Sequence, residues 1–283
     1  HFKTSTGIFF FFYYGFIQLI MNLSKRLSSK DICIVWDFKN GSQKRKKLYS
    51  EIDLSSFNII NESDKVTLYK EGRDKDASKL VLENLEQLKL DLQHFGVTQY
   101  SKEGFEADDL AAYLVKENKN NKIYLFSTDN DWKSLINSRT FLCSSSKKDI
   151  EIMNKTKFIE KYGFEPEKMH DYKCFLGDKS DRIPGIKRLN KQKIIEFINE
   201  EGIDKIFSKK KIKNNYVNNL LKSNSEVLQI LNFNKSIVSF DYPDKLEPFL
   251  KGQYNLKEII KLRDKYELKT LLSDASIQNF SKI

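Results

Sequence analysis

The chain has 283 residues, of which 40% are hydrophobic, and its aromatic side chains comprise 21 Phe, 13 Tyr and 2 Trp. This length and composition predict one large domain or two small ones with a real core, and they exclude a disordered or fibrous chain. Lys and Arg (49) outnumber Asp and Glu (39), and the net charge of +10 favours a polyanionic partner such as nucleic acid or an anionic membrane surface, with solubility as the simpler explanation.

Cysteine and histidine are too sparse for several kinds of site. Cys33, Cys143 and Cys174 are far apart and form no CxxC pair, which argues against a disulfide framework or a zinc knuckle and favours a reducing compartment. We therefore expect a cytoplasmic location, the cytoplasm of a host cell included, with an organelle left open. None of the three histidines lies in an HExxH motif, so any catalysis is expected to use carboxylates.

The most apolar segment is GIFFFFYYGFIQLIM at residues 7–21. A membrane-spanning helix needs about 20 apolar residues, and this segment is shorter and contains Gln18. It predicts a core helix that continues to residue 27, with a signal anchor as the alternative.

The next segments alternate between strands and helices. Residues 31–36 form a continuous apolar run that predicts a strand buried on both faces and ending at Asp37. Residues 39–76 are rich in charge and predict an irregular, exposed excursion with a basic run at 44–47. A helix at 80–95, a strand at 97–100, a helix at 106–116 and a strand at 122–126 follow. This alternation predicts an α/β fold with a mainly parallel sheet, whose ligand crevice lies beyond the carboxyl ends of the strands.

After an edge strand at 147–153 the chain is expected to be helical, with helices at 154–162, 166–175, 191–200, 225–233 and 256–272. The Lys- and Asn-rich residues 209–215 interrupt this region and are either a solvated loop or a phosphate-contact loop. The expected domains are therefore an α/β part at 1–153 and a helical part at 154–283.

Acidic residues stand at the ends of the predicted elements. They form four groups: Asp37; Glu106, Asp108 and Asp109; Asp129 and Asp131; Asp178 and Asp181. Helix capping alone explains the second group, but it does not explain why both apolar strands end in Asp. We therefore expect the four groups to meet in one crevice.

So many carboxylates repel one another unless cations bind between them. Oxygen ligands select Mg²⁺ or Mn²⁺, and two such ions about 4 Å apart support phosphodiester hydrolysis. A DxD motif after a strand also occurs in aspartyl-phosphate phosphatases, but these use a DxDxT/V loop, whereas here Asp131 is followed by Trp132 and Lys133.

Three segments carry a family resemblance: FEADDLAAYLVK (105–116), STDNDWKSL (127–135) and GDKSDRIPG (177–185). In this order and spacing they resemble the 5′-nuclease or flap endonuclease superfamily, especially the bacteriophage-type 5′-3′ exonucleases, over essentially the whole chain. The resemblance implies a PIN-like sheet, a helical arch at about 38–95 and a helix-three-turn-helix at about 170–202. It also implies a monomer without membrane attachment that acts in DNA replication and repair on DNA with free 5′ ends or flaps and leaves 5′-phosphates.

The resemblance also implies roles for individual residues. YKEGR at 69–73 matches the family's YKxxR, so Lys70 and Arg73 are expected at the scissile phosphate. Two Mg²⁺ (or Mn²⁺) ions are implied, one bound by Asp37, Glu106 and Asp108, the other by Asp129, Asp131 and Asp178, with Asp109 and Asp181 in support.

The chain departs from the family at the DNA-binding hairpin, where it reads GIKRLN at 185–190 instead of a GxGxG-like sequence. Because Arg188 and Asn190 replace glycines, side-chain contacts from Lys187, Arg188, Lys191 and Lys193 are expected to substitute for amide–phosphate contacts, and the family's monovalent cation (K⁺) is left open. The segment after Asp37 is longer than in the family, and Lys44 and Arg45 within it are expected to face DNA.

Family members begin with a strand of the type IDGNN that supplies a further metal ligand, and His1 already lies beyond it. We therefore expect an amino-terminally truncated chain with weakened metal binding and low activity. Two alternatives follow: a DNA-binding module of the same fold without catalysis, and a ribonuclease that acts on RNA–DNA hybrids.

Overall fold

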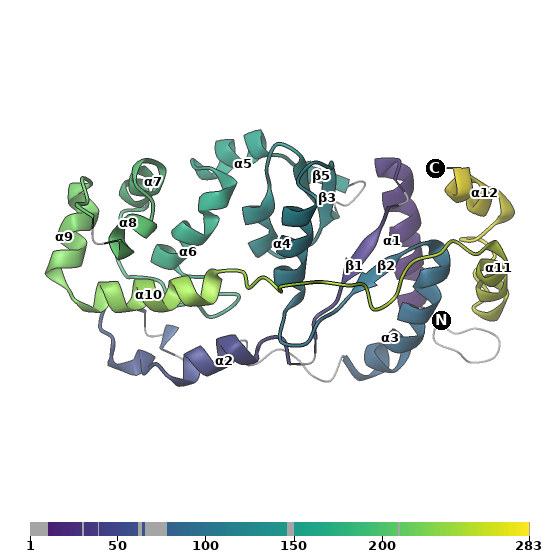
Figure 1. The fold of residues 1–283 in the computed structure, drawn as a ribbon, viewed down its shortest axis with the longest axis horizontal. Helices are drawn as coiled ribbons and strands as arrows, with labels where there is room; N and C mark the ends of the chain where they lie inside the picture. The colour runs from purple at the N-terminus through teal and green to yellow at the C-terminus, as the bar shows by residue number, and fades with distance from the viewer. Residues whose placement is uncertain are drawn as a thin grey trace. The chain divides into compact units, whose positions relative to one another are not determined.

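The computed structural model describes residues 11–29, 31–38, 40–61, 64–65, 78–145, 150–208 and 210–282 (Figure 1). They form two compact units: one takes its described residues from His1–Phe38, Arg73–Lys102 and Asp244–Ile283, the other from Lys39–Gly72 and Glu103–Pro243. These borders differ from the expected division at residue 153. The expectation of two separate domains divided there stays a prediction. The mixture of helices and small sheets confirms the α/β class.

The first unit contains helices around a parallel strand pair. Strand β1 (Cys33–Val35) pairs with β2 (Thr98–Tyr100). Around them lie α1 (Phe11–Leu27), α3 (Ser78–Leu92), the 3-10 helix η3 (Gln93–Phe95), α11 (Leu256–Lys265) and α12 (Asp274–Lys282). Gly96 takes a left-handed backbone, φ 80°, that ends η3 where the sequence predicted a helix stop.

Helix α1 confirms the predicted core helix. Tyr13, Ile17, Ile20 and Ser24 are buried at the spacing of one helix face. The Tyr13 ring stacks on Tyr266 at a centroid distance of 4.0 Å. Within the described ranges, none of the helices combines the length and the apolar character that crossing a bilayer requires.

The prediction that the first strand is buried on both faces is wrong. Cys33 is exposed, and Ile34 and Val35 are half-buried. Ile34 packs against the described apolar core of this unit, whereas the Cys33 side chain does not.

The second unit contains a three-stranded sheet in the order β3-β4-β5. Strands β3 (Ile123–Phe126) and β4 (Thr140–Ser145) are parallel, and β5 (Ile150–Met153) pairs antiparallel with β4. Strand β5 lies at the edge of this sheet, and an edge strand was predicted for that segment. Helices α4 (Ala107–Glu117) and α5 (Lys155–Tyr162) flank these strands in the sequence and were predicted, whereas β4 was not.

The prediction of an irregular, exposed excursion at 39–76 is wrong for its described part. Helix α2 (Gln43–Ser50) and the 3-10 helix η1 (Leu54–Ser56) form there. Tyr49 packs edge-on against Phe233, with ring centroids 5.0 Å apart, and Leu54, Phe57 and Ile60 are buried in the same apolar cluster. Lys44, Lys46 and Lys47 are exposed on a helix whose buried residues, Arg45 and Tyr49, are four apart. The basic run therefore hid the buried face of this helix.

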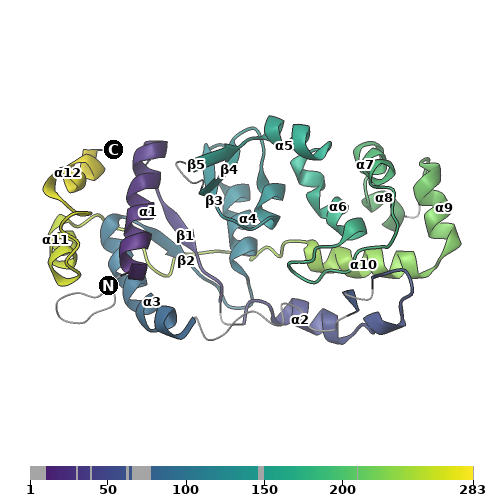
Figure 2. The ribbon, with the colours of Figure 1, turned by 180° about the vertical axis from the view of Figure 1, so that it is seen from behind.

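The helical half of this unit contains η5 (Pro166–Lys168), α6 (Met169–Leu176), α7 (Lys191–Glu200), α8 (Asp204–Phe207), α9 (Asn215–Ser223) and α10 (Glu226–Val238). Helix α10 packs against α6, and Figure 2 shows it running beneath the other helices of this region. Helix α9 was not predicted. In the first unit, α11 stops at Lys265, well before the predicted residue 272.

Candidate functional site

The acids at 106–109 lie at the start of α4. Glu106 is the N-cap residue, with an extended backbone, and Asp108 and Asp109 are in the first turn, where the helix dipole favours negative charge. The Glu106 backbone N–H donates to Asp109 Oδ2 at 3.1 Å. Glu106 is 6% exposed and Asp109 is 1% exposed, so both are buried carboxylates.

Arg45 from α2 compensates this buried charge. Its Nη2 donates to Asp109 Oδ1 at 2.9 Å, and its Nη1 donates to Glu106 Oε2. Arg45 is only 7% exposed, which corrects the expectation that it faces DNA. Lys44, one residue earlier, is exposed and pairs with Asp241.

Asp131, Asp178 and Asp181 form a second acidic cluster. One carboxylate oxygen from each lies within 4.8 Å of the others. Asp131 begins the 3-10 helix η4 (Asp131–Leu135) soon after β3, and the other two belong to a tight turn after α6 that the Asp178–Ile183 bridge closes. Residues almost fifty positions apart are thus brought together, as the sequence predicted for these three.

Lys173 lies at this second cluster and was not predicted to be there. It is 4% exposed, and its Nζ contacts both Asp131 and Asp178. Burial alone would raise the pKa of Asp178, but the charge and hydrogen bond of Lys173, with hydrogen bonds from Ser180, outweigh it and lower that pKa. The available signal was a lysine among the apolar residues of MHDYKCFL, five residues before Asp178.

Trp132 connects the two acidic groups. Its Nε1 donates to Asp108 Oδ1, while Asp129 Oδ1 accepts the Asp131 backbone N–H at 2.9 Å. All these carboxylates offer hard oxygen donors, and Arg45 and Lys173 each pair with two of them. The donor set therefore fits Mg²⁺ or Mn²⁺.

The position of the remaining predicted site residues relative to these clusters is not described. Asp37 is exposed after β1 and belongs to the other compact unit, so it is described only within that unit. Lys70 and Arg73 lie outside the described residues. For these three, the predicted roles stay predictions.

The hairpin at 185–190 connects the acidic turn to α7. The Lys187 backbone N–H donates to Ile59 O at 2.7 Å, and the Asn190 side chain caps α7 by accepting the Lys193 backbone N–H. Arg188 has a left-handed backbone, φ 54°, a conformation that favours glycine. Arg188, Lys191 and Lys193 are exposed, and Lys187 is half-buried.

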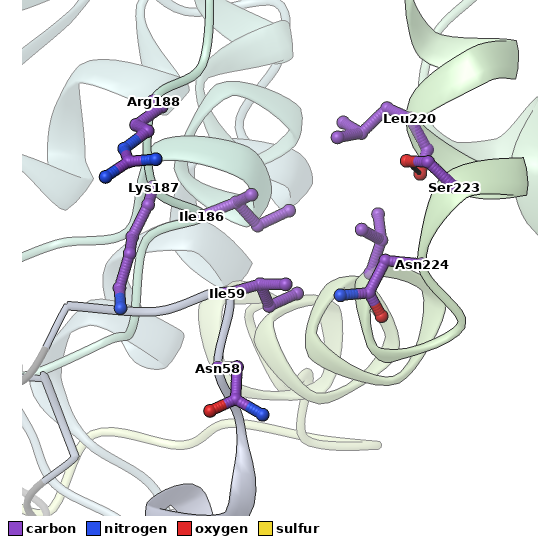
Figure 3. A pocket seen from close by; sticks show the side chains of 9 residues that line it. Asn58, Ile59, Ile186, Lys187, Arg188, Leu220, Ser223 and Asn224 are labelled. Carbon is purple, nitrogen blue, oxygen red and sulfur yellow. Dashed lines mark hydrogen bonds between the residues drawn. The ribbon is translucent and has the colours of Figure 1, made fainter.

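A cavity of about 440 Å³ lies beside this hairpin, lined also by the α9–α10 junction. Figure 3 shows Ile59 and Ile186 pointing into it, whereas the charged ends of Lys187 and Arg188 point away from it. Asn58, Ser223 and Asn224 also line the cavity, so its lining mixes polar and apolar side chains.

Comparison of the sequence and the fold with those of known proteins agrees with the nuclease family that the acidic motifs resemble. Residues 1–163 match the sequence model of the family described as 5′-3′ exonuclease, N-terminal resolvase-like domain. A 5′-3′ exonuclease of Mycoplasma genitalium is 30% identical over 229 residues, which are 76% of this chain and 74% of that protein. A 5′-3′ exonuclease of Aquifex aeolicus is 27% identical over 67% of this chain, and the match spans only 59% of that relative.

Among solved structures, a pseudo-enzyme–product complex of the bacteriophage T5 flap endonuclease with DNA and metal ions has a similar fold. The TM-score is 0.52 at 20% sequence identity, over 80% of each chain. The family match covers more than half of the 283 residues. The chain therefore belongs to the 5′-3′ exonuclease family of the 5′-nuclease superfamily.

Proposed function

We propose that this chain carries the catalytic site of a metal-dependent 5′-3′ exonuclease and structure-specific 5′-flap endonuclease that acts on DNA and leaves 5′-phosphate products. The observation that carries this proposal is the cluster of Asp131, Asp178 and Asp181, which Trp132 connects to the acids at the start of α4. Family membership indicates the class of reaction, and the clustered carboxylates indicate where in the fold that reaction takes place.

In this proposal two Mg²⁺ or Mn²⁺ ions bind the carboxylates. Glu106 and Asp108 would hold one ion, and Asp129, Asp131, Asp178 and Asp181 the other, with Asp37 as a further ligand that rests on the sequence resemblance alone. When bound, such ions polarise the phosphodiester and lower the pKa of an attacking water. Lys173 and Arg45 hold the carboxylates near one another without the ions, because each buried cation contacts two of them.

DNA contact is proposed for Lys187, Arg188, Lys191 and Lys193, with exposed Lys44 as an additional contact. The exposure of Arg188, Lys191 and Lys193 and the net charge of +10 support phosphate binding. Lys70 and Arg73 are proposed at the scissile phosphate from their sequence motif. The solved T5 complex contains DNA and metal ions, and its fold likeness makes both reasonable partners.

The test is Mg²⁺-dependent cleavage of a 5′-flap DNA by the full-length protein. We expect the double variant Asp129→Asn with Asp131→Asn to lose at least roughly 100-fold in rate, because the hard anionic donors of one ion are removed. Glu160→Gln changes an exposed acid on α5 and is the matched control, expected to cleave at the parental rate. Equal rates for the double variant and the parent would contradict the proposal.

The same assay separates the alternatives. A DNA-binding module would bind flap DNA but show no cleavage that is sensitive to EDTA, and this result would argue against an enzyme. Faster cleavage of a matched RNA–DNA hybrid than of DNA would indicate the ribonuclease activity.

A further inference from the structure

We infer that Arg45 is a positioning residue, which together with Asp109 fixes the carboxylate of Glu106 for a divalent cation. The inference rests on the proposed function, because it concerns one of the carboxylates proposed to bind metal. It also changes the role of Arg45, for which the sequence predicted a DNA contact, and it specifies the supporting role predicted for Asp109.

The guanidinium of Arg45 is held by protein acceptors on several sides. Besides its two carboxylate partners, Nε donates to Ile237 O at 3.1 Å and Nη2 to Ser239 O at 3.3 Å. A guanidinium has five N–H donors in a rigid plane, so these acceptors define its orientation. The contacts tie α2 to the start of α4 and to the end of α10. Because protein carboxylates already pair with Arg45, its positive charge needs no DNA contact to explain it.

Asp109 is likewise occupied by protein donors. Its Oδ1 accepts from Arg45 Nη2 and from the Asp241 backbone N–H, both at 2.9 Å, and its Oδ2 accepts from the Glu106 backbone N–H. A carboxylate with three such donors, 1% exposed, has little room for a metal ion. Asp109 therefore acts through Glu106 and Arg45.

Glu106 is consequently fixed at two points. Its backbone is held by Asp109, and its carboxylate is held by Arg45. Arg45 also pairs with Asp109, so its single positive charge is shared between two carboxylates. Because Arg keeps its proton at every working pH, this arrangement persists without metal.

The test is calorimetric Mn²⁺ binding by the full-length protein and its variants, with flap cleavage measured in parallel. We expect Arg45→Gln to weaken Mn²⁺ binding about 10- to 100-fold, the range that loss of an orienting partner causes at metal sites. Arg45→Lys keeps the charge but cannot bridge two carboxylates, and we expect a smaller loss. Lys46→Gln alters an exposed cation on the same helix and is expected to bind Mn²⁺ like the parent.

Unchanged Mn²⁺ affinity in Arg45→Gln would overturn the inference while leaving the nuclease proposal intact if the parent cleaves DNA. If Arg45→Gln binds Mn²⁺ more weakly than the parent but the parent cleaves no flap DNA, the nuclease proposal is overturned and the inference about Arg45 stands. If Arg45→Gln does not fold, as judged by near-ultraviolet circular dichroism, Arg45→Lys decides: parental Mn²⁺ affinity in this folded variant would overturn the inference.

Discussion

Single residues decide how the acidic site is held together, and their local sequence revealed only some of them. The acids at the ends of β3, α6 and the start of α4 were predicted, since carboxylates repeatedly ended predicted elements. Arg45 and Lys173 were not predicted as their partners. Which residue of the run KRKK turns inward depends on acids about sixty positions away in the sequence, and no local pattern encodes that.

His170 makes the stability of the fold depend on pH. Its Nε2 is enclosed without a hydrogen-bond partner in the described part of the chain, and its ring lies against Phe240 with centroids 4.7 Å apart. Burial, with a smaller contribution from the charge of Arg45, lowers the pKa of His170 from 6.5 to about 4. The unfolded chain therefore takes up a proton that the folded chain refuses, and stability falls as pH drops from 6.5 toward 4.

The expected loss is roughly 3 kcal/mol from this residue, at 1.36 kcal/mol per pKa unit. Urea unfolding at a series of pH values measures it. His170→Phe should flatten the decline relative to the parent. An equally steep decline in His170→Phe would contradict the assignment.

Arg188 combines backbone strain with a proposed DNA contact, so two opposite effects are expected from one substitution. Arg188→Gly should raise the free energy of unfolding by up to about 1 kcal/mol, because glycine accepts a left-handed backbone. It should also weaken duplex binding and reduce the salt slope of log K by about one, because a phosphate contact is lost.

Chemical denaturation and DNA titration at several salt concentrations separate these effects. Arg188→Ala is the control: it should lose the DNA contact in the same way but gain no stability. Parental salt dependence in both variants would show that Arg188 does not contact phosphate.

At the scale of elements, segments with strong hydrophobic periodicity were predicted correctly, whereas segments of mixed composition were not. Helices α3, α4 and α7 were predicted because their apolar residues recur at helical spacing. Strand β4 was missed, since TFLCSS gains its identity from pairing with β3 and β5 rather than from its own alternation. Helix α9 was hidden in a stretch rich in Lys and Asn.

Glu201 holds the end of that stretch, just before α9. The carboxylate accepts backbone N–H groups from Lys213 at 2.9 Å and from Asn214 at 2.6 Å, and it pairs with Lys205 at 2.5 Å. Burial opposes ionisation, but these donors prevail and lower the pKa of Glu201 to about 2. The protein itself therefore holds Lys213 and Asn214, in the segment expected to be either a solvated loop or a phosphate-contact loop.

Glu201→Gln should lower the free energy of unfolding by about 1 to 2 kcal/mol, since hydrogen bonds to a charged acceptor are replaced by weaker ones. The deficit should shrink as the pH falls from 4.5 toward 2, because the parent's carboxylate then becomes protonated. Urea unfolding measures both effects, and Glu200→Gln changes the exposed neighbour as a control. A neutral Glu201→Gln would show that the carboxylate does not hold this loop.

At the scale of the whole molecule, three short motifs were sufficient to predict the family and the fold class. The motifs are far apart in the sequence because each acidic group of the site lies on a different helix, strand or turn. The compact units were not predicted: each gathers segments far apart in the sequence, and composition along the chain carries no record of that assembly.

The central claim is that acids from separate elements form a divalent-cation site. The most direct measurement is an anomalous difference map, collected at the manganese edge, from crystals of the full-length protein grown with Mn²⁺. We predict peaks bound by Asp131 and Asp178 in one position and by Glu106 and Asp108 in another. A saturated crystal with no manganese at any of these four carboxylates would contradict the account.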